Sequence, residues 1–281
     1  LQVGRKNLII NGRGFVDQRA KSGVAISSGG FALDRWSSAQ AATTFTQLSG
    51  GGFKSASTYA STWSRIVYKV EDCYNIIGTK QVTLSFDIKW NTHSGNGNSM
   101  VYLKWLQANG TETGTATTAD ISKVGLSGKE RFSATFTIPS DATTPKHLMI
   151  LFYGAKATAS TWDFELDNVQ LELGSVATDF EHRSYGEELA LCQRYYERVI
   201  GTNATGGTYL SSHEYIAGSN SRLHVAFKTT MRVTPTITHG NWTDGSPATQ
   251  GITNSGVGFY QASSFRMYAG SAGYINADAE L

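Results

Sequence analysis

The chain has 281 residues, a length that predicts about two domains, each with ample core. Its 24 basic and 22 acidic side chains give a net charge of +2, and no run of five like charges occurs. This balance argues against nucleic acid or an anionic membrane as a partner. No apolar stretch approaches the roughly 20 residues of a membrane span, so no membrane insertion is expected.

Composition and alternation both predict a mainly β protein. With 30 Gly, four Pro and 11% aromatic residues, the chain favours short strands joined by tight turns. Residues 82–90, VTLSFDIKW, place five apolar side chains on one face and four polar side chains on the other. Further strands are expected at residues 101–106, 132–138 and 147–153. Because no helical period separates them, a β-sandwich is favoured over a parallel α/β sheet.

The segment WDFELD, residues 162–167, places three carboxylates on one strand face, with neighbours roughly 6 to 7 Å apart. Carboxylates at this spacing suggest a glycosidase. However, catalytic carboxylates flank a sugar bond across a cleft, so a solvated strand face is the preferred interpretation and no catalytic residue is assigned. The row continues into apolar Val169, Leu171 and Leu173, and this change predicts a bulge or sheet edge near Asp167 and Asn168.

A short helix is predicted after this strand. Gly174 ends the alternation, and Ser184 followed by Glu187 fits a capping box. Beyond the cap, apolar residues recur at steps of three and four and form one stripe without a partner. This stripe is the predicted oligomerisation face, and it consists of Leu189, Cys192, Tyr196 and Val199.

The remaining 80 or so residues read as strands with a thin core. Strand-like segments occupy residues 208–216, 222–229 and 235–239, and glycine recurs throughout the last stretch. Such a segment would struggle to offset its ordering entropy alone, which favours association of several chains. The expected domains are 1–180, a sandwich; 181–201, linker and amphipathic helix; and 202–281, a β-rich C-terminal tip.

Sugar binding would need exposed aromatic side chains, since pyranose rings stack on Trp and Tyr. Burial is expected for Trp36, Trp90, Trp105 and Trp162. The predicted ligand-binding residues lie in polar segments or opposite an apolar strand face. They are Trp242, in the loop HGNWTDG, and Tyr260, Tyr268, Trp63, Tyr59 and Tyr102.

No pattern for metal or nucleophilic catalysis is present. The six histidines are scattered, and neither an HExxH nor a GxSxG sequence occurs. The two cysteines, Cys73 and Cys192, fit no zinc motif, and both are taken as structural and reduced. The sequence therefore predicts no enzyme.

Four segments resemble the distal part of tailed-bacteriophage tail fibres: QLELG, the linker after it, FEHRSYGEELALCQRYYER and the terminal ADAEL. In addition, NLIINGRGFVDQR and LDRW, within residues 7–36, resemble the opening strands of jelly-roll domains in carbohydrate-binding modules. The resemblance implies a jelly-roll β-sandwich, a short helical connector and a small β-rich tip, assembled as a homotrimer. It also implies a virion protein, made in the bacterial host cytoplasm and joined to upstream tail fibre segments.

The resemblance implies a function in host attachment, through a cell-surface glycan or an outer-membrane protein. In the sugar-binding modules a structural calcium ion is often held by an Asp of the last strand, which corresponds to Asp167, with Asp17 as the weaker partner. A salt-bridged carboxylate is an equally good interpretation of Asp167. Two alternative functions are a tailspike-like glycan depolymerase and a purely structural trimerisation end.

Overall fold

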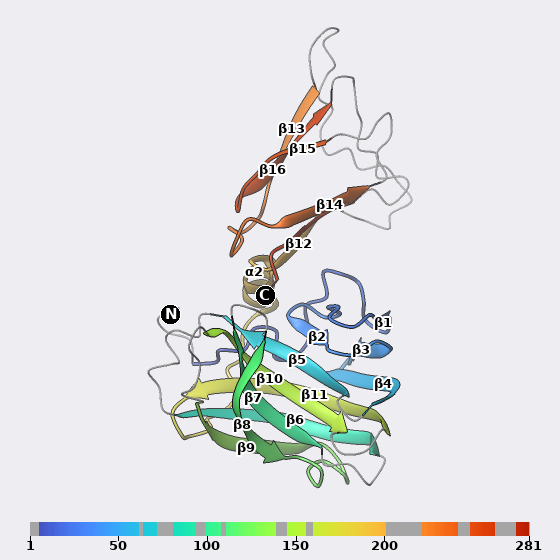
Figure 1. Cartoon of the computed structure of the whole chain (residues 1–281), viewed down its shortest axis with the longest axis vertical. Coiled ribbons are helices and arrows are strands. Elements are labelled where there is room, and N and C mark those ends of the chain that lie inside the picture. Colours follow the sequence, from blue (N-terminus) through green and yellow to red (C-terminus); the bar gives the residue numbers. More distant parts are fainter. Residues whose placement is uncertain are drawn as a thin grey trace. The chain divides into compact units, whose positions relative to one another are not determined.

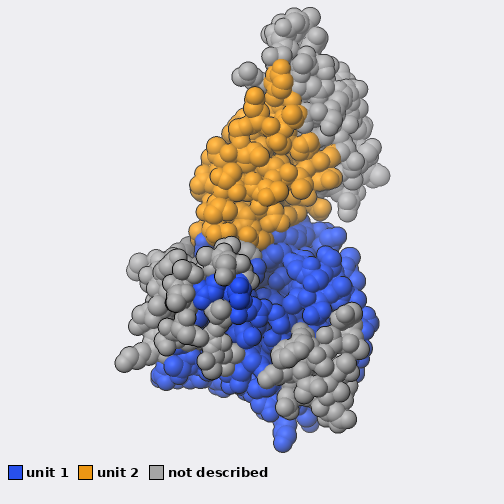
Figure 2. All heavy atoms as spheres, viewed as in Figure 1, with its two compact units in different colours: residues 1–188, 281 blue, residues 189–280 orange. Residues whose placement is uncertain are grey.

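The computed structural model describes residues 6–61, 64–71, 81–93, 99–107, 111–138, 145–155, 160–200, 221–240, 248–261 and 274–280. The chain divides into two compact units, which Figure 2 colours separately: unit 1, residues 1–188 with 281, and unit 2, residues 189–280. The division falls inside the residues 181–201 that the sequence assigns to linker and helix.

Unit 1 is a mainly β, jelly-roll sandwich of two antiparallel sheets (Figure 1). The six-stranded sheet has the order β1 (Ala25–Ile26), β3 (Thr43–Gln47), β4 (Phe53–Ser61), β11 (Ser160–Leu173), β6 (Gln81–His93) and β9 (Glu130–Thr137). The five-stranded sheet has the order β2 (Trp36–Ser38), β5 (Ser64–Val70), β10 (Pro145–Ala155), β7 (Met100–Gln107) and β8 (Glu112–Asp120).

The core lies between the two sheets and is rich in aromatic rings. Trp36, on the five-stranded sheet, lies 4.8 Å from Phe53 on the other sheet, measured between ring centroids. Phe86 and Phe152 make a second contact across the sheets, edge to face at 5.1 Å. The predicted inward face of residues 82–90 is confirmed, since all five of its apolar side chains belong to this core. The four tryptophans expected to be buried are at most 6% exposed.

The predicted bulge in β11 is confirmed. The register with β6 shifts between Asp167 and Gln170, and Asn168 has a φ of 50°. Before the shift even-numbered residues such as Leu166 face the core, and after it odd-numbered residues such as Leu171 do. One inserted residue therefore keeps the apolar side chains of a long strand inside.

Residues 6–24 form no strand, so the opening strands implied by the resemblance are shorter than expected. The reason is local: Asn11 and Gly14 have φ values of 58° and 64°, which no strand accommodates. Side chains replace the missing ladder. The Asn11 amide donates to the carbonyl of Val16 and accepts from its N–H, and the Asn7 Oδ1 accepts from Ile9 N.

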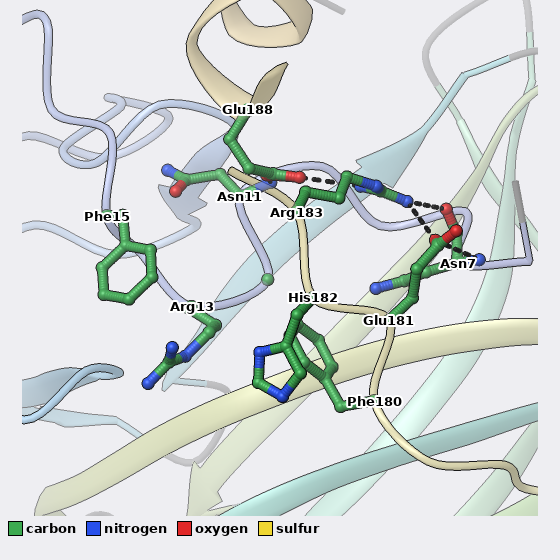
Figure 3. Close-up of a pocket in the computed structure, with 10 residues that line it drawn as sticks. Asn7, Asn11, Arg13, Phe15, Phe180, Glu181, His182, Arg183 and Glu188 are labelled. Carbon is green, nitrogen blue, oxygen red and sulfur yellow. Dashed lines mark hydrogen bonds and ion pairs between the residues drawn. The ribbon is translucent and has the colours of Figure 1, made fainter. Parts of the chain in front are cut away.

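Within unit 1, the buried guanidinium of Arg183 joins the linker after β11 to the N-terminal segment (Figure 3). Arg183, whose side chain is 7% exposed, donates to the backbone carbonyls of Asn7 and Ile9 at 2.6 and 2.9 Å. It also pairs with Glu181 at 2.8 Å and with Glu188 at 2.7 Å. Burial by itself lowers the pKa of Arg183, but the two carboxylates outweigh it and raise the pKa. The guanidinium is therefore charged, and each of its two terminal nitrogens makes two hydrogen bonds to the chain around it.

The helix α2 (Tyr185–Gln193) begins with the predicted capping box. Ser184 N donates to the Glu187 carboxylate at 2.9 Å, and Glu187 N donates to Ser184 Oγ at 3.3 Å. The helix ends at Gln193, earlier than the apolar stripe predicts. Among the described residues no helix is long and apolar enough to cross a membrane.

Unit 2 contains two three-stranded antiparallel sheets. One has the order β12 (Tyr196–Ile200), β17 (Tyr274–Asp278) and β14 (Thr236–Gly240), and the other β13 (Ser221–Ala226), β16 (Gly256–Gln261) and β15 (Ala248–Ile252). Their shared core includes Phe259 and Ile275, and the His239 ring meets Phe259 edge to face at 5.2 Å. A Cβ at Gly258 would lie 2.3 Å from the carbonyl oxygen of Gln250, so this glycine permits close strand pairing.

We predict that Arg183→Ala lowers the free energy of unfolding of unit 1 by about 3 to 5 kcal/mol, because it leaves two carboxylates without their cation. The measurement is urea unfolding of the full chain, in which the unfolding transition of each unit is monitored separately. The control is Lys89→Ala, which removes a 40% exposed partner of Glu165 and should cost about 1 kcal/mol or less. Equal losses in the two variants would contradict the role given to Arg183.

We also predict that Glu197 makes unit 2 less stable as pH rises. Its carboxylate is fully buried, accepts from Lys228 N at 3.0 Å, and burial raises its pKa above the ordinary 4.5. A raised pKa means that folding favours the protonated form, so stability is highest below pH 4.5 and falls as pH rises through the folded pKa. In Glu197→Gln this fall should disappear. A stability difference between the two proteins that does not change with pH would contradict the prediction.

Candidate functional site

The outer face of the five-stranded sheet of unit 1 carries the described residues best suited to bind a ligand. In β5 the residues Ile66, Tyr68 and Val70 face the core, so Arg65 projects from the other side. Arg65 pairs in register with Tyr153 of β10, which is flanked by β7. We call the following set the outer-face cluster: Arg65, Tyr102, Lys104, Glu112 and Tyr153.

Polar atoms of the outer-face cluster are held in fixed positions. Arg65 Nη1 donates to the Tyr153 hydroxyl at 2.9 Å, and its Nη2 pairs with the Glu112 carboxylate. Lys104 Nζ lies 3.5 Å from the same carboxylate. Burial raises the pKa of Tyr153 against the opposing effect of Arg65, so its phenol is neutral at physiological pH. The arrangement offers two cations and one carboxylate side by side.

The rings of the cluster lie beneath these polar groups. Tyr102 and Tyr153 are 5% and 1% exposed, and their ring centroids are 4.8 Å apart. The side chains of Arg65, Lys104 and Glu112 are 17%, 24% and 28% exposed. A ligand would therefore meet the polar rim, whose groups bind hydroxyls, rather than the faces of the rings.

The prediction that Tyr102 is exposed is wrong. Tyr102 packs into an apolar layer on this outer face, together with Val67, Met149, Leu151 and Tyr153. The alternation within residues 101–106 alone suggested a solvated side, because the apolar side chains that cover Tyr102 come from β5 and β10. Tyr102 therefore does not offer the exposed ring on which a sugar could stack.

The other predicted ligand-binding residues are not brought together by the described structure. Tyr260 lies in β16, half-buried, with its backbone paired to Arg222 and Ala248. Tyr59 belongs to β4, and its side chain is outside the described part. Trp242, Tyr268 and Trp63 also lie outside the described residues, as does Cys73. Binding by these residues stays a prediction.

The carboxylate row of residues 162–167 is an ion-paired surface of the six-stranded sheet. Asp163 lies 3.5 Å from Lys54, Glu165 lies 3.1 Å from Lys89, and Asp167 lies 3.0 Å from Arg13. In the register, Glu165 is opposite Lys54 on one neighbour and Lys89 on the other. Each carboxylate therefore has a cationic partner from another part of the chain, the arrangement of a structural surface.

The residues around Asp167 do not fit the calcium site that the resemblance implies. Arg13 and, at 3.5 Å, Lys129 both pair with this carboxylate, whereas calcium needs several anionic or neutral oxygens. Asp17 accepts from the backbone N–H groups of Lys21 and Ser22 and closes a turn. Across the described part of the chain, no group of three or more His, Cys, Asp or Glu side chains could hold a metal ion.

The predicted oligomerisation stripe does not form on one helix. Leu189 and Cys192 belong to α2, but Tyr196 and Val199 lie in β12. Cys192 is 0% and Tyr196 6% exposed within the single chain, and Val199 packs against the core of unit 2. β12 forms because β17 supplies hydrogen bonds to its backbone, and its β-branched residues suit a strand. The argument for association from an unpartnered stripe is therefore wrong.

Four residues of the outer-face cluster were missed from the sequence: Arg65, Lys104, Glu112 and Tyr153. Alternation in residues 64–70, SRIVYKV, places Arg65 opposite three apolar side chains and could have marked it. The same period places Tyr153 on the opposite face from Phe152. The contact between Arg65 and Tyr153 joins residues 88 apart in the chain, and no local sequence pattern predicts such a pairing.

Comparisons with known proteins show only distant likenesses. No family model and no curated protein matches the chain. A solved xylan-binding domain, CBM22-1 of Paenibacillus barcinonensis Xyn10C, has 10% identity and a TM-score of 0.35, over 50% of this chain and 87% of that one. A CBM4 structure has 18% identity and a TM-score of 0.37, over 58% and 98%.

The enzymatically active domain of bacteriophage CBA120 tailspike protein 4 has 15% identity and a TM-score of 0.38. The match covers 60% of this chain but 21% of that protein, so it concerns a small part of the tailspike. At these scores the likenesses carry no argument about function. The functional argument rests on this chain's own residues.

We predict that calcium and chelator leave the melting temperature of unit 1 unchanged, because Asp167 is already neutralised by two cations. The measurement is thermal unfolding with EDTA and with calcium in excess. A ligand present at 100 times its Kd would add about 2.7 kcal/mol of stability, which is a readily visible shift. Such a shift, lost in Asp167→Asn, would restore the calcium site.

Proposed function

We propose that the chain is the receptor-binding end of a phage tail fibre, which attaches the virion to a glycan on the host cell surface. The observation that carries this proposal is the outer-face cluster. It places Arg65, Lys104 and Glu112 within reach of one ligand, on a rigid sheet. Donors and an acceptor in fixed positions suit the vicinal hydroxyls of a sugar, which present both kinds of group.

The tail fibre part of the proposal is supported by the sequence resemblance, at the segment FEHRSYGEELALCQRYYER, which contains α2, and at the ending ADAEL. Two alanines of that ending, Ala277 and Ala279, are buried in the core of unit 2, while Asp278 between them is half-buried. The packing of this strand therefore explains why small alanines alternate with a polar residue in the motif. We propose a homotrimer in the virion, joined to upstream fibre segments, where three copies would strengthen weak single-site binding.

We propose binding rather than catalysis. The carboxylate row on the six-stranded sheet is paired to Lys54, Lys89 and Arg13, and Glu112 is paired to Arg65 and Lys104. A glycan depolymerase would need two carboxyl groups facing each other across the bond to be cleaved. The described residues offer no such pair among these carboxylates.

The test is binding of the purified full chain to intact candidate host cells and to a glycan array. We expect Lys104→Ala to weaken glycan binding about tenfold, because a charged hydrogen bond is worth about 1.5 kcal/mol. The matched control is Lys54→Ala, since Lys54 also lies 3.5 Å from its carboxylate partner, on the opposite outer face of the sandwich. Light scattering should give three times the chain mass.

Four results would each contradict a part of the proposal. A chain that binds neither cells nor any glycan would remove the attachment function, and a monomeric mass would remove the trimer. If Lys54→Ala and Lys104→Ala weakened binding equally, the outer-face cluster would not be the site. Release of new reducing ends from host polysaccharide would favour the depolymerase instead.

A further inference from the structure

A pocket lies in unit 1 between the N-terminal segment and the linker that follows β11 (Figure 3). It is separate from the outer-face cluster, with which it shares no residue. Every residue that lines it belongs to residues 7–15 or 180–188.

Two aromatic rings of the pocket are partly open to solvent. Phe15 is 37% exposed, and the guanidinium of Arg13 lies over its ring, 4.4 Å from the centroid. Phe180 is half-buried, and the exposed His182 meets its ring edge to face at 5.0 Å. Each ring is braced by a polar neighbour. Braced, partly exposed rings with polar groups beside them are what the apolar face of a pyranose ring requires.

The charges of the lining cancel, and this determines the class of ligand. Arg183 is neutralised by Glu181 and Glu188, at 2.8 and 2.7 Å. Arg13 is neutralised by Asp167, which lies behind it at 3.0 Å. A carboxylate or phosphate would therefore find both guanidinium groups of the lining already paired with carboxylates, and the two carboxylates of the lining would repel it. The lining suits an uncharged, hydroxyl-bearing ring.

We propose that this pocket is a second sugar site, which binds a neutral pyranose unit of a glycan against Phe15 and Phe180. The inference goes beyond the proposed function, which rests on the outer-face cluster. Two sites on one unit would let a single chain hold a glycan at two points, with the second binding event made intramolecular.

The experiment is saturation-transfer NMR on the full chain, with the methyl glycosides of glucose, galactose, mannose and N-acetylglucosamine, and with methyl glucuronide as the acidic comparison. We expect transfer to at least one neutral glycoside and weaker transfer to the glucuronide. Phe15→Ala and Phe180→Ala should each weaken the affinity about five- to tenfold, because each removes a stacking surface.

The matched control is Leu126→Ala, which removes an apolar side chain of unit 1 that is 52% exposed and lies outside the pocket lining. Unfolding curves for each variant verify that the fold is intact. If one of the two Phe variants does not fold, the affinity of the other Phe variant for the glycoside tests the proposal. Absence of transfer from all four neutral glycosides overturns the proposal, as does stronger transfer from the glucuronide.

A further comparison separates this site from the proposed function. If the transfer survives both Phe variants and is lost in Lys104→Ala, the pocket proposal fails and the outer-face cluster is the sugar site. If the transfer is lost in the Phe variants and kept in Lys104→Ala, the pocket binds sugar, whichever role the outer-face cluster has.

Discussion

The buried ion-pair network of Arg183 is the interaction on which the organisation of unit 1 depends. The N-terminal segment has no β-ladder to hold it, and neither has the linker after β11. The guanidinium of Arg183 connects these two segments, because it donates to the carbonyls of Asn7 and Ile9 and pairs with the carboxylates of Glu181 and Glu188. Such a network is costly to desolvate and costly to break, so it specifies one arrangement of the two segments and the first turn of α2.

The two outer faces of the sandwich differ in their chemistry. The six-stranded sheet carries charges paired across neighbouring strands, as between Lys89 and Glu165. The five-stranded sheet instead carries an apolar layer around Tyr102 and Leu151, with a polar rim formed by Arg65, Lys104 and Glu112. A rigid sheet with such a rim is a better basis for recognition than a loop would be.

Unit 2 is small, and its glycines are part of how it folds. Gly256 and Gly258 lie in β16, where a Cβ would meet the carbonyls of Val225 and Gln250 at 2.8 and 2.3 Å. The absence of side chains there allows β13 and β15 to approach from both sides. The sparse core noted in the sequence is therefore in part a requirement of close strand pairing. The proposal of a trimer rests on the resemblance, and the mass measurement tests it.

The sequence by itself determined the sandwich class, the inward face of residues 82–90, the bulge near Asp167 and the capping box at Ser184. Each is a local pattern, set by the period of two in a strand or by a cap within one turn. Only the tertiary structure decided that Tyr102 is buried, that Tyr196 belongs to a strand, and which distant side chains form the outer-face cluster and the pocket. Those outcomes depend on strands and segments far apart in the chain, whose contacts no local period encodes.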